Sequence, residues 1–98
     1  MMHAGTLTMD LRIRGIGSLK AKRTVVKHLV ESCRSRFDVA AAEVGHQDQW
    51  QRSEVGFAAV ANTPGHVEDV LDAVERYVWS HPELEVLAEG RSWVEPDA

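Results

Sequence analysis

The stretch that decides the fold runs from residue 7 to residue 18, Leu-Thr-Met-Asp-Leu-Arg-Ile-Arg-Gly-Ile-Gly-Ser. Its first seven residues alternate apolar and polar side chains, the period of two that places one face of a strand on a core. Gly15 to Gly17 break the alternation, and Ser18 is a residue type that caps a helix by accepting a backbone N–H from the first turn. The stretch therefore predicts a strand over 7–13 and a helix that begins directly after Ser18.

The predicted helix runs from Leu19 to Arg36 and has two distinct sides. At 100° per residue its apolar side chains fall on one arc; they are Val25, Val26, Leu29, Val30 and Cys33. Nearly opposite lies a narrow row that we call the basic stripe, made of Lys20, Arg23, Lys27 and Arg34 and interrupted only by Glu31. We expect the apolar arc to be buried and the basic stripe to face solvent.

The next segments predict two strands joined by a long hairpin. Residues 37–44 carry small and branched apolar side chains on both faces, which indicates a strand buried on both sides. Residues 55–61 alternate again and predict another strand, and the polar segment 45–52 between them is expected to form the hairpin.

The last third of the chain predicts a second helix and a fourth strand. Thr63 and Pro64 are suited to the cap and first position of the helix, and Pro82 ends it. Its buried side is expected to hold Val67, Val70, Leu71, Val74 and Val78, and its far side Glu68, Asp69, Asp72 and Glu75. A strand is expected from Leu84 toward Trp93, with Trp79 and Trp93 packing near a sheet edge and 95–98 as a loose tail.

This element order predicts an α+β fold. Two β-α-β units joined by a hairpin give a four-stranded antiparallel sheet with both helices on one face, because right-handed crossovers return each helix to the same side. That arrangement is the ferredoxin-like βαββαβ two-layer sandwich. With 98 residues, the chain is expected to form this one domain over 1–98.

Composition narrows the classes of protein. No apolar run approaches the roughly 18 residues that cross a bilayer, and no signal peptide is evident, so we expect a cytoplasmic protein without a membrane partner. Cys33 is the only cysteine, which excludes an internal disulfide and a cysteine-based zinc cluster within one chain. The histidines lack metal-ligand spacing and no glycine-rich phosphate cradle is present, so no metal and no cofactor are expected.

Charge is divided sharply along the chain, although the net charge is only −4. Residues 1–36 hold eight basic and two acidic residues, whereas residues 37–98 hold three basic and thirteen acidic residues. Clustered Lys and Arg side chains can bind RNA by displacing the counterions of its phosphates. Solvated helix faces are also often charged, so the basic stripe, with Arg12, Arg14, Lys22 and Arg36 nearby, has either interpretation.

The predicted hairpin contains the chain's most distinctive side chains, Glu43, His46, Gln47, Asp48, Trp50, Gln51 and Arg52. In an extended segment His46 and Asp48 would project to the same side, where the carboxylate could orient the imidazole for proton transfer. The alternatives are that the hairpin binds a partner, or that His46, Asp48 and Arg52 fix its shape while Trp50 packs as an apolar anchor.

Two segments resemble a family. Residues 18–23, Ser-Leu-Lys-Ala-Lys-Arg, and 42–52, Ala-Glu-Val-Gly-His-Gln-Asp-Gln-Trp-Gln-Arg, are similar to the S-L-K-E-K-R and A-E-V-x-H-Q-D-x-W-Q-R segments of the YlxP-like bacterial domains of unknown function, DUF503. The resemblance implies the same ferredoxin-like fold and, because such proteins are typically encoded near translation and ribosome-maturation factors, a role beside the ribosome. Ala21 stands where the family commonly has Glu, so the reciprocal capping-box bond to Ser18 is lost.

Three functional hypotheses follow. The first is a non-catalytic accessory protein that binds RNA or a ribosomal particle through Lys20, Lys22, Arg23, Lys27 and Arg34, with the hairpin as a further contact. The second is a homodimer or other self-association through an open sheet face that carries Ala40, Ala42, Val44, Ala58 and Val60. The third is a small enzyme, which requires His46 and Asp48 to share a pocket.

Overall fold

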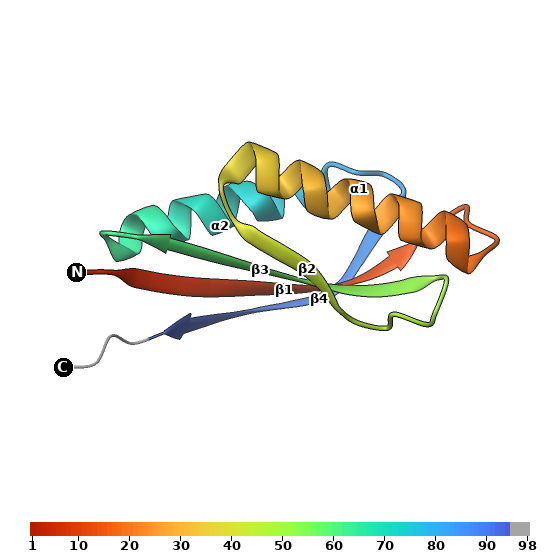
Figure 1. Cartoon of the computed structure of the whole chain (residues 1–98), viewed down its shortest axis with the longest axis horizontal. Helices are drawn as coiled ribbons and strands as arrows, with labels where there is room; N and C mark the ends of the chain where they lie inside the picture. The colour runs from red at the N-terminus through yellow and green to blue at the C-terminus, as the bar shows by residue number, and fades with distance from the viewer. Residues whose placement is uncertain (95–98) are drawn as a thin grey trace.

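The structure, a computed structural model, describes residues 1–94. Its elements are β1 (His3–Ile13), α1 (Leu19–Phe37), β2 (Ala40–Gly45), β3 (Arg52–Ala61), α2 (Pro64–Trp79) and β4 (Leu84–Val94). The strands form one antiparallel sheet in the order β2-β3-β1-β4, and both helices cover the same face of it (Figure 1). The predicted ferredoxin-like α+β fold is confirmed, and the expected tail over 95–98 lies outside the described residues.

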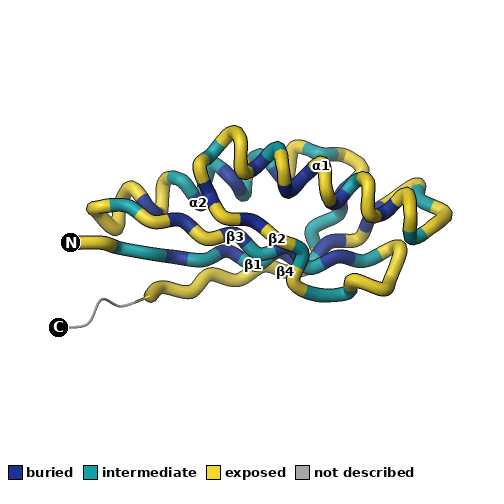
Figure 2. Tube along the Cα trace, in the orientation of Figure 1, coloured by how far each residue is buried: buried dark blue, intermediate teal, exposed yellow. Residues whose placement is uncertain are grey.

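The core lies between the sheet and the helices, and every second residue of β1 from Gly5 onward is buried (Figure 2). Leu7, Met9 and Leu11 have no exposed surface. Against them pack the buried side chains of α1, which include Val26, Leu29, Val30 and Cys33, and those of α2, which are Val67, Leu71, Val74 and Val78. Each such side chain contributes roughly 1.5–3 kcal/mol by leaving water.

Both predicted helix starts are confirmed, because each predicted cap residue forms the expected hydrogen bond to the first turn. The Ser18 Oγ accepts the backbone N–H of Ala21 at 3.1 Å, and the Thr63 Oγ1 accepts that of His66 at 3.2 Å. Each hydroxyl thereby satisfies one of the N–H groups that a first helical turn leaves without an intrahelical partner.

The second strand differs from its prediction. The helix α1 continues through Phe37, whose ring packs edge-on against Tyr77 of α2 at 5.5 Å, and it ends where Asp38 takes up a left-handed conformation with φ 53°. The strand therefore begins at Ala40. The predicted burial on both sides is wrong, because the helices cover only one face of the sheet and the outward side chains of β2, Ala40, Ala42 and Val44, are exposed (Figure 1).

The two helices are staggered along the molecule rather than aligned side by side. At about 1.5 Å per residue α1 is about 28 Å long and α2 about 24 Å, and the molecule extends 48 Å in its longest direction. Figure 1 shows that they overlap near their C-terminal ends, where Phe37 meets Tyr77 and Arg36 lies 4.7 Å above the Tyr77 ring. The helix α1 packs against β2, whereas α2 packs against β1, β3 and β4.

Strand β4 is tied to α2 by polar contacts. Arg91 forms ion pairs with Asp72 at 2.8 Å and Glu75 at 3.4 Å, so two of the acidic residues expected on the far side of α2 face β4 instead. Trp79, which donates its indole N–H to Glu89 at 3.3 Å, and Trp93 lie at this sheet edge as expected, but they remain 58% and 42% exposed. None of the helices within residues 1–94 combines the length and apolarity that a membrane crossing requires.

Candidate functional site

The basic stripe is a real surface feature of α1. Lys20, Arg23, Lys27 and Arg34 are all exposed. Within residues 1–94 the first three form no ion pair, whereas Arg34 donates to the backbone carbonyl of Ala41 at 2.7 Å. Because Ala41 belongs to β2, the stripe lies on the flank of α1 that adjoins this edge strand.

Lys22 does not belong to that surface, contrary to the expectation. Its side chain has no exposed surface, and its ammonium lies 2.5 Å from a carboxylate oxygen of Glu43. It also donates to the backbone carbonyls of His46 at 3.0 Å and Gln47 at 3.3 Å. The three donors of the ammonium thus have three acceptors, which is the condition under which a lysine is tolerated inside a protein.

This buried lysine connects the two segments that carry the family resemblance. Lys22 comes from the first segment, and Glu43, His46 and Gln47 come from the second. The Glu43 carboxylate accepts a further hydrogen bond of 2.6 Å from Ser53, which is fully buried in β3. The network therefore fixes the hairpin of residues 46–51 against the start of α1.

The imidazole of His46 faces a residue that the sequence did not suggest. His46 adopts a left-handed conformation with φ 58°, and its Nε2 lies 3.7 Å from a carboxylate oxygen of Asp10 in β1. The same carboxylate receives two hydrogen bonds from Nη2 of Arg52, at 2.7 and 2.9 Å. Asp10 thus holds Arg52 and, more loosely, His46 on the open face of the sheet.

The arrangement needed for the enzyme hypothesis is not formed within the described residues. Asp48 is exposed and no contact joins it to His46. A hollow at the hairpin is lined by residues 48–52 and does not include His46. The structure therefore separates the two residues that would have to act together, and the predicted orienting role of Asp48 is taken by Asp10.

The tip of the hairpin is a polar, exposed loop with one aromatic side chain. Trp50 is 40% exposed, so its indole is partly covered by the protein and partly open to solvent. Gln47 and Gln51 are exposed as well. The backbone of this loop is held from below by Lys22, while its side chains are free to meet a partner.

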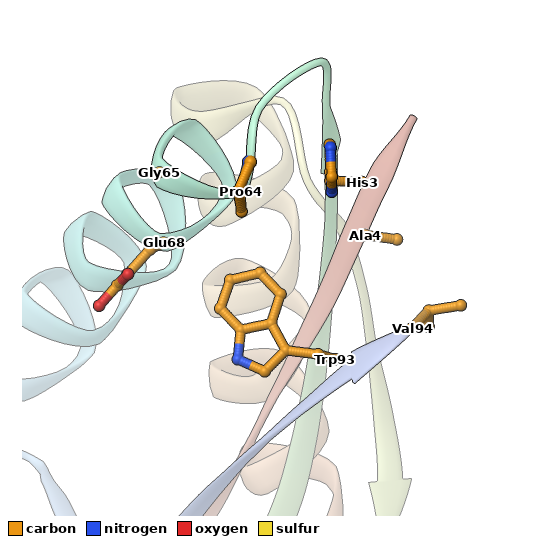
Figure 3. A pocket seen from close by; sticks show the side chains of 7 residues that line it. All are labelled: His3, Ala4, Pro64, Gly65, Glu68, Trp93 and Val94. Carbon is orange, nitrogen blue, oxygen red and sulfur yellow. The ribbon is translucent and has the colours of Figure 1, made fainter. Parts of the chain in front are cut away.

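A separate hollow of about 390 Å³ lies at the other end of the sheet, where α2 begins (Figure 3). The Trp93 ring lies between the first turn of α2 and β1, and the Glu68 carboxylate points away from it. Trp93, which lines this hollow, also packs against Gly5 of β1, which has no side chain. No group of three or more metal-ligating side chains comes together anywhere in residues 1–94.

Comparison with known proteins identifies the family. The family model described as "Protein of unknown function (DUF503)" matches residues 4–91. The chain belongs to the DUF503 family. A DUF503 relative from Bacillus subtilis (strain 168), the "Uncharacterized protein YlxP", is 38% identical over 77 residues, which are 79% of this chain and 84% of the relative. A structural-genomics protein, YJCS, is 14% identical with a TM-score of 0.48, over 94% of this chain and 99% of that one.

Proposed function

We propose that this DUF503 protein is a non-catalytic accessory protein that binds RNA, in translation or ribosome maturation, through the basic stripe of α1. The observation that supports the proposal is the row of exposed cations, Lys20, Arg23 and Lys27, which have no acidic partner within residues 1–94. Cations held at helical spacing can neutralise successive phosphates and release their counterions.

Exposed acidic residues on the other helix favour one binding orientation. Glu68 and Asp69 are exposed in the first turns of α2, so an approach toward that end of α2 meets negative charge. Charge of opposite sign on different faces steers a charged partner toward one of them. RNA would therefore dock on the flank of α1 that adjoins β2, with the hairpin as the adjoining contact.

The outward faces of β1 and β3 lack the aromatic side chains that base stacking requires. Outward-facing residues of these two strands include Thr6, Thr8, Gly56, Ala58 and Val60. No outward position of β1 from residue 4 to 12, or of β3 from residue 52 to 60, is aromatic. RNA readers of this architecture stack bases on aromatic side chains at such positions. Binding by this protein is therefore expected to tolerate changes of base sequence.

The test is fluorescence anisotropy of a labelled RNA over a series of salt concentrations. The double variant Arg23→Gln/Lys27→Gln should bind more weakly and lower the slope of log affinity against log salt by about 1.4–1.8, or about 0.7–0.9 for each lost phosphate contact. The single variant Lys27→Gln has a matched control, Arg76→Gln, which removes one exposed cation from α2 instead. Arg76→Gln should leave the slope of log affinity against log salt unchanged.

Equal effects of Lys27→Gln and Arg76→Gln would contradict the proposal, because they would show that only net charge matters. Failure of the unaltered protein to bind RNA at low salt would do so more directly. A gradient in which the protein cosediments with ribosomal particles at low salt and leaves them as salt rises would support the ribosomal setting.

A second candidate function, self-association, is favoured by an exposed apolar row on neighbouring strands. Val44 of β2 and Val60 of β3 are 53% and 65% exposed, and Ala40 lies directly opposite Ala58 between them. A second copy of the chain would remove this surface from water. Sedimentation equilibrium should show a dimer that Val60→Lys dissociates; a strict monomer at high concentration would exclude this candidate.

A further inference from the structure

A cavity of about 600 Å³ opens where β1 ends, and its lining is unusually rich in arginine. The lining residues are Arg12, Ile13, Arg14, Gly15, Ile16, Gln51 and Arg52. Three of the seven are arginines and none is acidic. The size falls in the range of roughly 300–1,000 Å³ that is typical of small-ligand sites.

Two of these arginines are placed directly opposite each other. Arg12 of β1 is the register partner of Arg52 of β3, and like charges at directly opposed positions of a sheet destabilise it. Arg52 is compensated by two hydrogen bonds to Asp10, and Arg14 by an ion pair of 3.2 Å with Glu85. Arg12 is exposed, and no ion pair to it is formed within residues 1–94.

The donors that a ligand would meet here come from side chains. The backbone N–H groups of Ile13 and Arg14 are already bonded to the carbonyls of Gln51 and Glu83, both at 2.9 Å. The guanidinium groups keep unused donors: the ion pairs of Arg14 and Arg52 each involve Nη2, and no side-chain hydrogen bond of Arg12 is formed within residues 1–94. Planar guanidinium groups match the paired oxygens of a phosphate.

The turn that closes the cavity leaves room for a ligand. Gly15 has φ +72°, a conformation that glycine adopts without strain, and a side chain added there would meet no atom within 4 Å. Figure 1 shows that the end of β1, the start of α1 and the hairpin lie together at one end of the molecule. The cavity therefore adjoins the end of α1 at which the basic stripe begins with Lys20.

We propose that this cavity binds a phosphate group, held chiefly by Arg12 with Arg14 and Arg52 beside it. We assign this phosphate to the backbone of RNA, and that assignment rests on the proposed function. The binding of a phosphate group in the cavity does not depend on the proposed function. An anion at this position also removes the repulsion between the opposed arginines. Arg12 is the residue to change, because its side chain forms no ion pair or hydrogen bond with the part of the chain that the structure describes.

The experiment has two arms. Each compares three proteins: the unaltered protein, the variant Arg12→Gln, and the matched control Lys27→Gln. In the first arm, inorganic phosphate is titrated into isotope-labelled protein at constant ionic strength and amide shifts are followed by NMR. Shifts should concentrate at residues 12–16 and 51–52, disappear in Arg12→Gln, and persist in Lys27→Gln. In the second arm, Arg12→Gln should lower the salt slope of RNA binding by about 0.7.

The outcomes separate this inference from the function. Phosphate shifts that Arg12→Gln abolishes, together with unaltered RNA binding by that variant, support the cavity but replace the RNA phosphodiester by a free or terminal phosphate. Phosphate shifts in a protein that binds no RNA support the cavity and contradict the proposed function. No localised shift, or shifts that survive both Arg12→Gln and the second variant Arg14→Gln, overturns the inference while leaving the basic stripe intact.

Discussion

The ammonium group of Lys22 exchanges its hydrogen bonds to water for bonds to Glu43, His46 and Gln47. Removing a lysine from water costs several kcal/mol, and only well-formed partners offset that cost. Here one partner is a carboxylate and two are carbonyls of the hairpin backbone. The pair therefore adds little net stability over an apolar core, but it specifies where the hairpin lies.

Lys22→Met should destabilise the protein by about 3–5 kcal/mol, because it leaves the Glu43 carboxylate without its cation and frees two carbonyls. Lys20→Met, two residues earlier on the exposed side of the helix, is the matched control and should change stability by less than about 0.5 kcal/mol. Urea unfolding measures both. Hydrogen exchange should quicken at residues 46–51 in Lys22→Met, or in the milder Glu43→Gln; equal exchange in all variants would refute the anchoring role.

The position of Lys22 on the helix indicates this burial. At 100° per residue Lys22 falls between Leu29 and Cys33, within the apolar arc of α1 rather than on the basic stripe. Asp10 offered no such sign, because a carboxylate on the polar face of a strand is ordinary. Its contact with Arg52 joins residues 42 positions apart, and only the register of β1 against β3 brings them together.

Cys33 offers a pH-dependent test of the core. The thiol is fully buried, and desolvation by burial raises its pKa to about 11 from an ordinary 9.0, although Arg36 acts in the opposite direction. The unfolded chain ionises this thiol first, so the stability that the neutral thiol contributes is complete below about pH 9 and is lost as pH rises toward 11. The loss is on the order of 2 kcal/mol.

The expected measurement is urea unfolding of the unaltered protein and of Cys33→Ala between these pH values. The two stabilities should converge as pH rises, because the variant lacks the thiol that titrates. Parallel curves would show that the thiol ionises alike in both states. Alkylation of the native protein should also be slow until urea unfolds it.

At the scale of elements, the alternation of β1 and the caps of both helices were predictable because they depend on neighbours in the chain. The second strand was not. Its apolar residues on both faces are typical of a sheet covered on both sides, yet the helices cover one face only, and β2 also lies at the edge because strand order depends on long-range pairing. Arg34 covers the Ala41 carbonyl, and a register irregularity follows Glu43, so the edge is partly protected against further strand pairing.

The contact of β4 with the start of α2 depends on a missing side chain. Gly5 of β1 is the register partner of Trp93, and a Cβ added there would lie 3.0 Å from Val67 and 3.3 Å from the Trp93 ring. The Trp93 ring of β4 and the Val67 side chain of α2 thus meet above the backbone of Gly5, where no side chain separates them. This explains why Trp93 can lie flat against the sheet although it is half-exposed.

Gly5→Ala should cost about 1–3 kcal/mol, because the added methyl forces Val67 or Trp93 from its position. Gly90→Ala is the control in β4, where an added Cβ meets no atom within 4 Å. That variant should be neutral or slightly stabilising. Thermal unfolding gives the stability difference, and a shift in tryptophan emission should accompany Gly5→Ala alone. Identical melting of the two variants would contradict the packing described.

At the scale of the molecule, the staggered helices place the basic stripe and two acidic residues of α2 toward opposite ends of the long axis. The basic stripe begins at the end of the molecule where β1 stops, and the acidic residues Glu68 and Asp69 lie near the other end, in the first turns of α2 (Figure 1). The division of charge between the two parts of the sequence was predictable from counting. Its direction in space was not, because it depends on how far the helices overlap.

This separation predicts an effect of residues that RNA does not touch. Glu68→Gln/Asp69→Asn removes two exposed carboxylates that form no ion pair within residues 1–94, whereas Asp72 and Glu75 are left to hold Arg91. At about 0.01 M salt the screening length is about 30 Å, so the loss of repulsion should raise the association rate with RNA about two- to threefold.

At about 0.15 M salt the screening length falls to about 8 Å and the gain should vanish, with the dissociation rate unchanged throughout. Stopped-flow anisotropy at both salt concentrations measures the two rates. A gain that persists at high salt, or that appears in the dissociation rate, would mean that RNA contacts the start of α2 directly. The docking surface would then have to extend to the acidic end of the molecule, and the one-sided approach toward α1 would be wrong.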